Sequence, residues 1–429
     1  MKPKLISLLP RSIGTLFIGI AFLATFASGQ QTLTWDQVKA KFEAANPTLK
    51  ADEINVREMK DQEITAYLRP NPQFTFSTDG TQIARHNGVW QPLAGTQYQP
   101  NVSYLHERER KRELRLQSAK EGTQIAGSQH DDLERNLIFN LRSVFIQTLE
   151  AKAALELAQA DLEYYDKIIE ISRERFKVGA IGQVDLDRIE LLRVQYESEI
   201  QTAIVNLRTS KIQLLQLLND RTLLDKFDVT GPFDFSDSMQ SQDAYRQIAL
   251  DNRPDLRAAL ESVEQAVTNH KLANANGSTD PTFGAWYTYN GSFNNPNSNQ
   301  TVGLNVSIPL RIFDRNQGEK KRTLIDIDRN RQLTEAARAQ VFSDVDSAFE
   351  EVQSNVVLLK PYRDKYKDQA TRVRDTVTYA YQRGAASLMD FLNAQSDYRV
   401  VQLAYLQLVG AYLTSASQLN LAVGREAIQ

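Results

Sequence analysis

Side chains that commonly carry out catalysis or bind metals are few and scattered in this chain of 429 residues. There is no cysteine, which excludes disulfides, thiolate metal sites and a cysteine nucleophile. The sequence also has no HExxH motif, no phosphate-binding glycine loop and no arrangement typical of a catalytic triad. The histidines lack the spacing of metal ligands; they are His86, His106, His130 and His270. We therefore predict that the chain is not an enzyme and holds no metal or cofactor.

Two aspartates occupy equivalent places in two copies of one sequence unit. The segment RFKVGAIGQVDL corresponds to AYQRGAASLMDF, which pairs Gly179 with Gly384 and Asp185 with Asp390. Earlier in each copy, PTLKA corresponds to PDLRA at nearly the same offset. A duplication over most of a chain is typical of quasi-symmetric bundles, barrels and tubes. Both aspartates follow a predicted helix start, where a carboxylate can simply stabilise the helix dipole.

Long helices must position these segments. Apolar and small residues recur in alternating steps of four and three from Leu137 to Phe176 and from Val341 to Val373, which predicts coiled-coil seams. The first helix should begin near Glu107 and span on the order of 100 Å at ~1.5 Å per residue. The small and polar seam residues favour close lateral packing of many helices around a wide ring.

Breaks in the helical pattern divide each copy into a hairpin. Gly179 and Gly384 should end their long helices, because glycine readily adopts the left-handed turn that often follows a helix. Helices should resume at about Val184–Leu218 and Leu388–Val423. Pro361 should bend the second long helix, since proline removes a hydrogen bond and clashes with the preceding turn.

Four segments alternate between apolar and polar residues with a period of two, which predicts β-strands. They form two pairs, and a polar loop joins each pair: Gln73–Thr78 and Gln97–Tyr104 around the loop Asp79–Thr96, and Thr282–Tyr289 and Thr301–Ile308 around the loop Asn290–Gln300. Tyrosine-rich strands of this kind suit a barrel with lipid outside and water inside, although a half-buried hairpin in a soluble domain would alternate in the same way. Four strands cannot close a useful barrel, and open sheet edges are not tolerated in lipid. Several chains must therefore contribute strands, and a trimer would supply twelve.

The N-terminus has the pattern of an export signal. Lys2, Lys4 and Arg11 accompany an apolar run from Ile13 to Phe26, and small residues follow, which predicts a cleaved signal peptide at 1–29. The alternative is an uncleaved membrane anchor, for which the run is short. No later stretch approaches ~20 apolar residues, so we expect no transmembrane helix in the mature chain. The net charge of −3, without a basic cluster, argues against a nucleic-acid partner.

The predicted fold class is mainly α with a β-barrel contribution, in a duplicated arrangement. Residues 30–218 should form the first repeat, with a helix, a strand pair and a long helical hairpin. Residues 219–242 contain a Gly-Pro break and should form an irregular equatorial linker. Residues 243–424 should form the second repeat, and residues 425–429 a C-terminal tail.

Over nearly its whole length after the signal peptide, the chain resembles the TolC-like outer-membrane efflux channels. The resemblance rests on the duplication and on the motifs at the two glycine turns, RFxxG followed by Asp185 and YxxG followed by DFLNAQ. The segment IPLRIFDRNQG, between the last strand and the second long helix, resembles the branch often paired with heavy-metal cation pumps.

The resemblance implies a homotrimer with one barrel in the outer-membrane lipid and a helical tunnel in the periplasm. It also implies docking to a periplasmic adaptor protein and an inner-membrane efflux pump. Such a channel performs no chemistry and passively conducts substrates whose export the pump drives. The alternative is a periplasmic coiled-coil scaffold or adaptor without a barrel; the strand pairs argue against it, and solubility without detergent would favour it.

Roles at the periplasmic entrance are also implied by the resemblance. Asp390 would belong to a carboxylate ring in the pore, Asp185 would lie near the neighbouring hairpin, and Tyr381 matches a tyrosine that latches some members shut. Asn393 stands where some members have a second ring aspartate, and Ala386 where some have a latch arginine. Three aspartates in one ring would repel one another, which would favour bound cations or raise their pKa values.

The glycine turns themselves would form the periplasmic tips, where the adaptor docks. The residues assigned to this docking region are Gly179, Gly384, Arg175 and Arg383.

Overall fold

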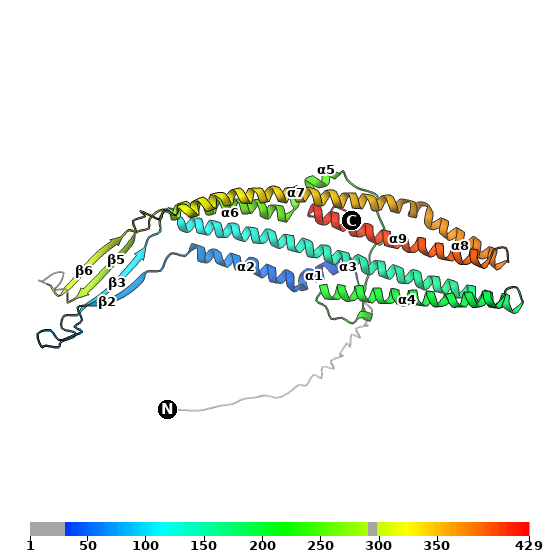
Figure 1. Cartoon of the computed structure of the whole chain (residues 1–429), viewed down its shortest axis with the longest axis horizontal. Coiled ribbons are helices and arrows are strands. Elements are labelled where there is room, and N and C mark those ends of the chain that lie inside the picture. The colour runs from blue at the N-terminus through cyan, green and yellow to red at the C-terminus, as the bar shows by residue number, and fades with distance from the viewer. Residues whose placement is uncertain (1–30, 291–297, 429) are drawn as a thin grey trace, which may run out of the picture.

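The computed structural model describes residues 31–290 and 298–428; the predicted signal peptide and the middle of the loop Asn290–Gln300 lie outside this part. The molecule is elongated, with a β-sheet at one end and two helical hairpin tips at the other (Figure 1). The same order of elements occurs twice. The first copy comprises α1 (Trp35–Ala45), α2 (Pro47–Tyr67), β2 (Gln73–Asp79), β3 (Gln97–Leu105), α3 (Lys111–Lys177) and α4 (Gln183–Leu217). The second comprises α5 (Gln242–Asn252), α6 (Pro254–Asn276), β5 (Thr282–Tyr289), β6 (Gln300–Ser307), α7 (Gln317–Pro361), a π-helical turn (Tyr362–Tyr366), α8 (Lys367–Gln382) and α9 (Leu388–Val423).

The long helix α3 has the length expected from the sequence, because its 67 residues span about 100 Å at ~1.5 Å per residue. It begins at Lys111 rather than near Glu107. The residues Glu109 and Arg110 both have positive φ angles, of 56° and 54°, and form the tight turn that precedes the helix. Within residues 31–290 and 298–428, no helix combines the length and apolar character needed to cross a bilayer.

The glycine turns at the two tips have the predicted left-handed conformation. Gly179 has a φ angle of 76° and Gly384 one of 77°. After each glycine the chain closes the turn with matching backbone bonds: Ala180 N–H donates to Arg175 O at 2.8 Å, and Ala385 N–H donates to Ala380 O at 2.9 Å. The duplication in sequence is therefore also a duplication in local geometry.

The second long helix bends at the predicted place, where α7 ends at Pro361 and a π-helical turn leads into α8 (Figure 1). The turn shifts the buried face, so the predicted single seam from Val341 to Val373 is wrong beyond Leu359. Val373 is exposed within this chain, whereas Tyr381, further along α8, is buried. A π-helical turn accommodates an extra residue, which rotates every later side chain around the helix axis.

The four predicted strands form one antiparallel sheet in the order β2-β3-β5-β6. Their observed bounds lie within one residue of the predicted ones. On one face the register places Phe74 opposite Val102, Val102 opposite Ala285, and Ala285 opposite Leu304. The apolar sets predicted for the individual strands therefore share one continuous face of the sheet.

The linker predicted at 219–242 is mostly irregular but contains a strand that the sequence pattern did not reveal. This strand, β4 (Phe227–Val229), pairs in parallel with β1 (Gln31–Leu33) after a 3-10 turn at Leu224–Lys226. Phe227 and Val229 are buried in a core with Phe42 of α1. The strand pair thereby ties the linker to the start of the first repeat.

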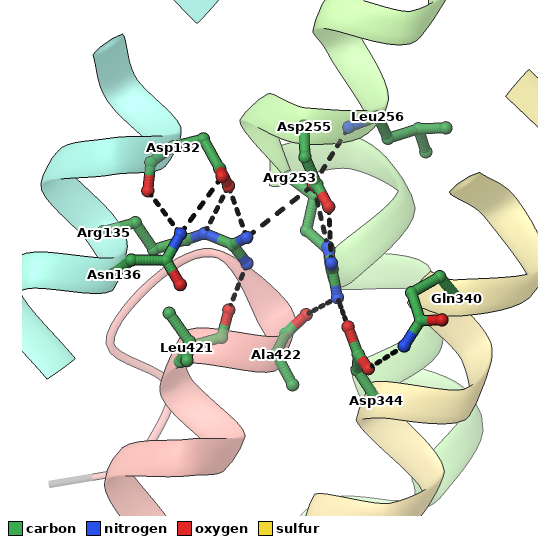
Figure 2. Close-up of polar contacts among 10 residues, drawn as sticks. All are labelled: Asp132, Arg135, Asn136, Arg253, Asp255, Leu256, Gln340, Asp344, Leu421 and Ala422. Atoms are coloured by element: carbon green, nitrogen blue, oxygen red, sulfur yellow. Dashed lines mark hydrogen bonds and ion pairs between the residues drawn. The ribbon is translucent and has the colours of Figure 1, made fainter. Parts of the chain in front are cut away.

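Two arginines, the buried Arg253 and the half-buried Arg135, join four helices near the middle of the molecule, as Figure 2 shows. Arg253 donates to Asp255 at 3.0 Å, to Asp344 of α7 at 2.7 Å and to the carbonyl oxygen of Ala422 at 3.3 Å. Arg135 of α3 donates to the neighbouring carbonyl oxygen of Leu421 at 2.5 Å. The guanidinium groups thus bond the last carbonyls of α9, where cations stabilise the helix dipole.

Candidate functional site at the hairpin tips

The two hairpin tips lie side by side and share one hydrophobic cluster (Figure 1). Tyr165 and Tyr196 stack within the α3–α4 hairpin with ring centroids 4.5 Å apart. Tyr381 and Phe391 stack in the same way within the α8–α9 hairpin, at 4.9 Å. These rings, each at most 4% exposed, hold each hairpin together, and their common cluster brings the hairpins into contact.

Arg175 forms a direct link between the two tips. Its Nη1 donates to the backbone carbonyl oxygen of Tyr381 at 2.7 Å, and its guanidinium carbon lies 4.9 Å from the centre of the Tyr381 ring. The same guanidinium approaches Gly384, at which a Cβ would meet Arg175 Nη2 at 3.9 Å. We call this contact the Arg175–Tyr381 clasp. Arg175 was assigned from the sequence to the docking tip, and the structure shows it reaching across to the other hairpin.

Tyr381 is 4% exposed, so within this chain its ring is packed between the hairpins. Burial raises the pKa of its hydroxyl group, which the Arg175 guanidinium partly opposes. The buried hydroxyl of Ser172 lies beside the Tyr381 hydroxyl and likewise opposes the rise in its pKa. Its role in the pore aperture stays a prediction.

Asp390 caps the helix on which it lies. Ser387 is the N-cap residue of α9; its hydroxyl donates to Asp390 Oδ2 at 2.7 Å, and its backbone N–H donates to the same oxygen at 3.2 Å. These bonds hold the pKa of Asp390 below its ordinary value. Of the two roles that the sequence allowed for Asp390, these bonds correspond to the first, which is to stabilise the start of its own helix. The carboxylate is nevertheless exposed, so a second role in the pore stays a prediction.

The remaining predicted residues lie close to the same tips. Asn393 is exposed and lies three residues after Asp390, which places both on one face of α9. Asp185 is half-buried in the first turn of α4. Arg383 is exposed and stacks on Tyr379 of its own hairpin at 4.8 Å.

A second group of charged residues, which sequence reasoning missed, lies further from the tips. Arg399 of α9 forms an ion pair with Glu199 of α4, in which its Nη1 donates to both carboxylate oxygens at 2.9 and 3.0 Å, and its guanidinium stacks on Tyr196. Asp161 of α3 is 9% exposed, and burial raises its pKa to about 6. These residues line a groove of about 970 Å³ between α3, α4 and α9. No motif marks them, because the three helices meet only in the folded chain.

The glycine turns give a prediction with an internal control. Gly179→Ala and Gly384→Ala should each destabilise the chain by about 1 to 2 kcal/mol, because alanine is strained at positive φ. A Cβ at either position would meet no atom closer than 3.9 Å, so backbone strain alone is tested. Gly127→Ala, in open space within α3, should instead stabilise by about 0.5 to 1 kcal/mol. Thermal melting, monitored by circular dichroism, measures both the predicted loss and the predicted gain in stability. A Gly179 variant as stable as the Gly127 variant would contradict the argument.

The sheet at the opposite end presents a large apolar face. Val302 is 82% exposed and Leu304 86%, and Phe74, Phe76 and Val306 are also exposed. On the other face, Trp286 lies over Gly303, where a Cβ would overlap the indole ring. The two outer strands, β2 and β6, each have one edge without a strand partner among the described residues. An exposed apolar face and open edges both call for a partner.

No group of three or more histidine or acidic side chains within the described residues could hold a metal ion.

Comparisons with known proteins agree with this architecture. Residues 245–425 match the sequence model of a family described as outer membrane efflux protein. TolC, an outer membrane protein of Salmonella enteritidis, is 22% identical over 95% of this chain and 85% of its own length. The cobalt-zinc-cadmium resistance protein CzcC of Cupriavidus metallidurans is 21% identical over 73% of this chain and 74% of its own.

Among solved structures, CusC has the same fold. It superposes with a TM-score of 0.75 over 91% of this chain and 92% of its own, at 16% sequence identity. Its structures describe folding and transmembrane channel formation. At this identity, the likeness shows that the long helices, the hairpins and the sheet are arranged in the same way.

Proposed function

Since this chain belongs to the TolC-like outer-membrane efflux proteins, we propose that three copies of it form the outer-membrane channel of a tripartite efflux system. The sheets cross the outer membrane, and the helices extend into the periplasm. The channel passively conducts substrates that an inner-membrane pump delivers through a periplasmic adaptor. The relatives are channels rather than enzymes, which agrees with the lack of a catalytic arrangement in the sequence.

The observation that carries the proposal is the four-stranded sheet with an exposed apolar face and two open edges. In lipid, every backbone N–H and C=O group needs a partner, so a spanning sheet must close into a barrel. Pairing β6 of one copy with β2 of the next satisfies both edges at once. Three copies supply twelve strands, with the apolar face turned toward lipid and the face bearing Asn101, Thr288 and Asn305 toward water.

The helical end supports an entrance at the hairpin tips. Asp390 and Asn393 are exposed on one face of α9, so three copies around an axis can bring them together as rings. The Ser387 bonds keep the pKa of Asp390 low, which favours a charged ring at neutral pH. Tyr381 packs between the hairpins, and the Asp185 carboxylate is close enough to raise its pKa, so a change in the distance between the hairpins would alter the aperture.

The exposed tips also suit a docking surface for the adaptor. Gly179, Gly384 and Arg383 are all exposed at the end of the molecule farthest from the sheet. Arg175 is half-buried, and through the Arg175–Tyr381 clasp it holds together the two tips that form this surface. The likeness to CzcC, named for cobalt, zinc and cadmium resistance, suggests divalent cations as cargo. A carboxylate ring at the entrance would attract such cargo.

The proposal is tested by reconstituting the purified protein in planar bilayers. We expect particles with the mass of three chains and a stable conductance that micromolar divalent or trivalent cations block from the tip side. Asp390→Asn keeps a side-chain oxygen for the Ser387 bonds but removes three charges from the ring. It should weaken the block by tenfold or more.

Glu174→Gln is the matched control, because Glu174 is also exposed near a tip but lies on α3 of the other hairpin, where it already pairs with Lys177 at 2.7 Å. Its cation block should stay close to that of the parent protein. An unchanged block in the Asp390 variant would remove this residue from the pore. A monomer that dissolves without detergent and gives no conductance would instead support a periplasmic scaffold.

A further inference from the structure

The groove of about 970 Å³ between α3, α4 and α9 runs along the long helix and is open to solvent. Its lining comes from residues 147–161 of α3, 195–213 of α4 and 396–407 of α9, so one chain provides all of its walls. The stretch of α3 in the groove is about 21 Å long at ~1.5 Å per residue. The groove therefore suits an elongated occupant that lies along the helix.

Asp161 lies at the end of the groove that is nearer to the hairpin tips. Its side chain is 9% exposed, and among the described residues it accepts no hydrogen bond and has no cation within ion-pair distance. Burial is the main cause of its raised pKa. Since Asp161 lines the groove, an occupant of the groove can reach its carboxylate. A buried carboxylate without a partner is destabilising, and a bound cation would remove that cost.

Glu150 supplies a second unpaired carboxylate at the other end of the groove. It is half-buried against Gly410 of α9, where a Cβ would overlap its carboxylate, and burial raises its pKa. No hydrogen bond or ion pair of Glu150 is found within residues 31–290 and 298–428. Glu150 and Asp161 are 11 residues apart, about three turns, so both lie on one face of α3 at a distance of about 16 Å.

The balance of charge in the groove favours a cation. The charged residues that line it are Glu150, Asp161, Glu199 and Arg399. Arg399 and Glu199 pair with each other, which leaves the two unpaired carboxylates. Arg374 lies outside the lining but close enough to oppose the rise in the pKa of Asp161; its own charge is offset by Asp375 at 2.9 Å.

The surface between the two carboxylates is apolar on α3 and polar on α4. Ala154, Leu157 and Ala158 line the groove on α3, where methylene groups gain by contact. Across from them, α4 contributes hydroxyl and amide side chains, including Thr202 and Asn206, whose oxygens can accept hydrogen bonds from amines. A single metal ion holds carboxylate oxygens at about 2.0 to 2.6 Å and cannot bridge side chains this far apart.

We propose that this groove binds a linear polyamine, an extended chain of methylene groups with an ammonium group at each end. One ammonium group pairs with Asp161 and the other with Glu150, and each pair is a charge-assisted hydrogen bond. The methylene groups lie on the apolar strip of α3. The site does not depend on the channel function, because every residue that lines it belongs to one chain.

Equilibrium dialysis of the full-length protein in neutral detergent tests the proposal, with spermine as the probe. We expect saturable binding of about one spermine per chain at physiological salt. Asp161→Asn and Glu150→Gln should each weaken the binding by tenfold or more. The asparagine variant removes an unpaired buried charge, so it is expected to fold at least as well as the parent, and weaker binding then reports on the site itself.

Glu163→Gln is the matched control, since Glu163 is an exposed carboxylate on the same helix that pairs with Lys167 at 3.0 Å. It changes the net charge by the same amount and should leave spermine binding unchanged. A loss of binding as large as in the Asp161 variant would show that spermine responds only to the overall charge, and would overturn the proposal.

Two further probes test the span between the carboxylates. Putrescine, a much shorter diamine, should bind at least tenfold more weakly than spermine because it cannot reach both ends. Magnesium ions should compete only weakly. Absent binding, equal affinity in the parent and in both groove variants, or putrescine that binds as tightly as spermine would each contradict a polyamine site here.

Discussion

Replacing Arg175 by alanine is expected to part the two hairpin tips. The substitution removes the hydrogen bond to the Tyr381 carbonyl oxygen and the stacking on the Tyr381 ring, which are the direct polar contacts of the clasp. A charged hydrogen bond contributes about 1.5 to 3 kcal/mol and an exposed cation–π contact about 0.5 to 1 kcal/mol. Because Arg175 is half-exposed, we expect the free energy that holds the two tips together to fall by about 1 to 2 kcal/mol per chain. This changes the ratio of joined to parted tips about 5-fold to 30-fold.

Spin labels at Ala180→Cys and Ala385→Cys measure this separation, since both positions are exposed and the chain has no native cysteine. Labelled chains diluted with unlabelled ones report the distance within one chain. The distance distribution should become longer and broader in the Arg175 variant. In planar bilayers, the same variant should show a several-fold larger conductance if the tips form the entrance.

Arg383→Ala is the matched control for the clasp. Arg383 also stacks on a tyrosine at a similar distance, 4.8 Å compared with 4.9 Å, but the ring of Tyr379 belongs to its own hairpin. Its removal should leave the distance between the tips unchanged. Equal distributions in the Arg175 variant and the parent protein would show that the shared hydrophobic cluster and the polar contacts further from the tips, such as Arg399–Glu199, join the hairpins without the clasp.

Local sequence signals were sufficient for most of the fold. The strand bounds, the helix ends at Gly179 and Gly384 and the bend at Pro361 each follow from a short pattern with one physical cause. The π-helical turn could not be predicted from such a pattern, because a proline predicts that a helix is interrupted but not how many extra residues the interruption accommodates. The strand β4 was missed for a different reason, since three residues are too few to show a period of two.

The candidate site at the hairpin tips was predictable only in part, because a sequence motif marks some of its residues but not the contacts between the hairpins. The sequence located Asp390 and Gly384 at a tip, because both belong to a repeated motif. It could not show that the guanidinium of Arg175 reaches the other hairpin, since the partner is a backbone carbonyl oxygen that any residue could provide.

Replacing Asp161 by asparagine is expected to stabilise the protein near neutral pH. The two guanidinium groups that face Asp161 have other partners: Arg399 pairs with Glu199, and Arg374 pairs with Asp375 at 2.9 Å and stacks on Tyr398. Burial therefore dominates and raises the pKa of Asp161 from 3.8 to about 6, with Arg374 and Arg399 opposing the shift and Glu199 adding to it.

The raised pKa of Asp161 determines how the stability of the protein changes with pH. Below pH 3.8 the carboxyl group is protonated in both the folded and the unfolded chain and ionisation costs nothing. Between pH 3.8 and about 6 the unfolded chain loses its proton first, so stability falls as the pH rises. Above pH 6 the full penalty applies, at most about 3 kcal/mol at ~1.4 kcal/mol per pKa unit.

Thermal melting at pH 4 and pH 7.5 therefore separates this effect from a general change in packing. Asp161→Asn should raise the midpoint by several degrees at pH 7.5 and by much less at pH 4, because only the charged form is penalised. Asp166→Asn is the control on the same helix: its carboxylate pairs with Arg193 at 2.6 Å and is partly exposed, so its loss should destabilise by about 1 kcal/mol or less. A gain of equal size at both pH values would mean that asparagine simply packs better in the groove, and a loss at pH 7.5 would mean that Asp161 is paired in the assembled protein.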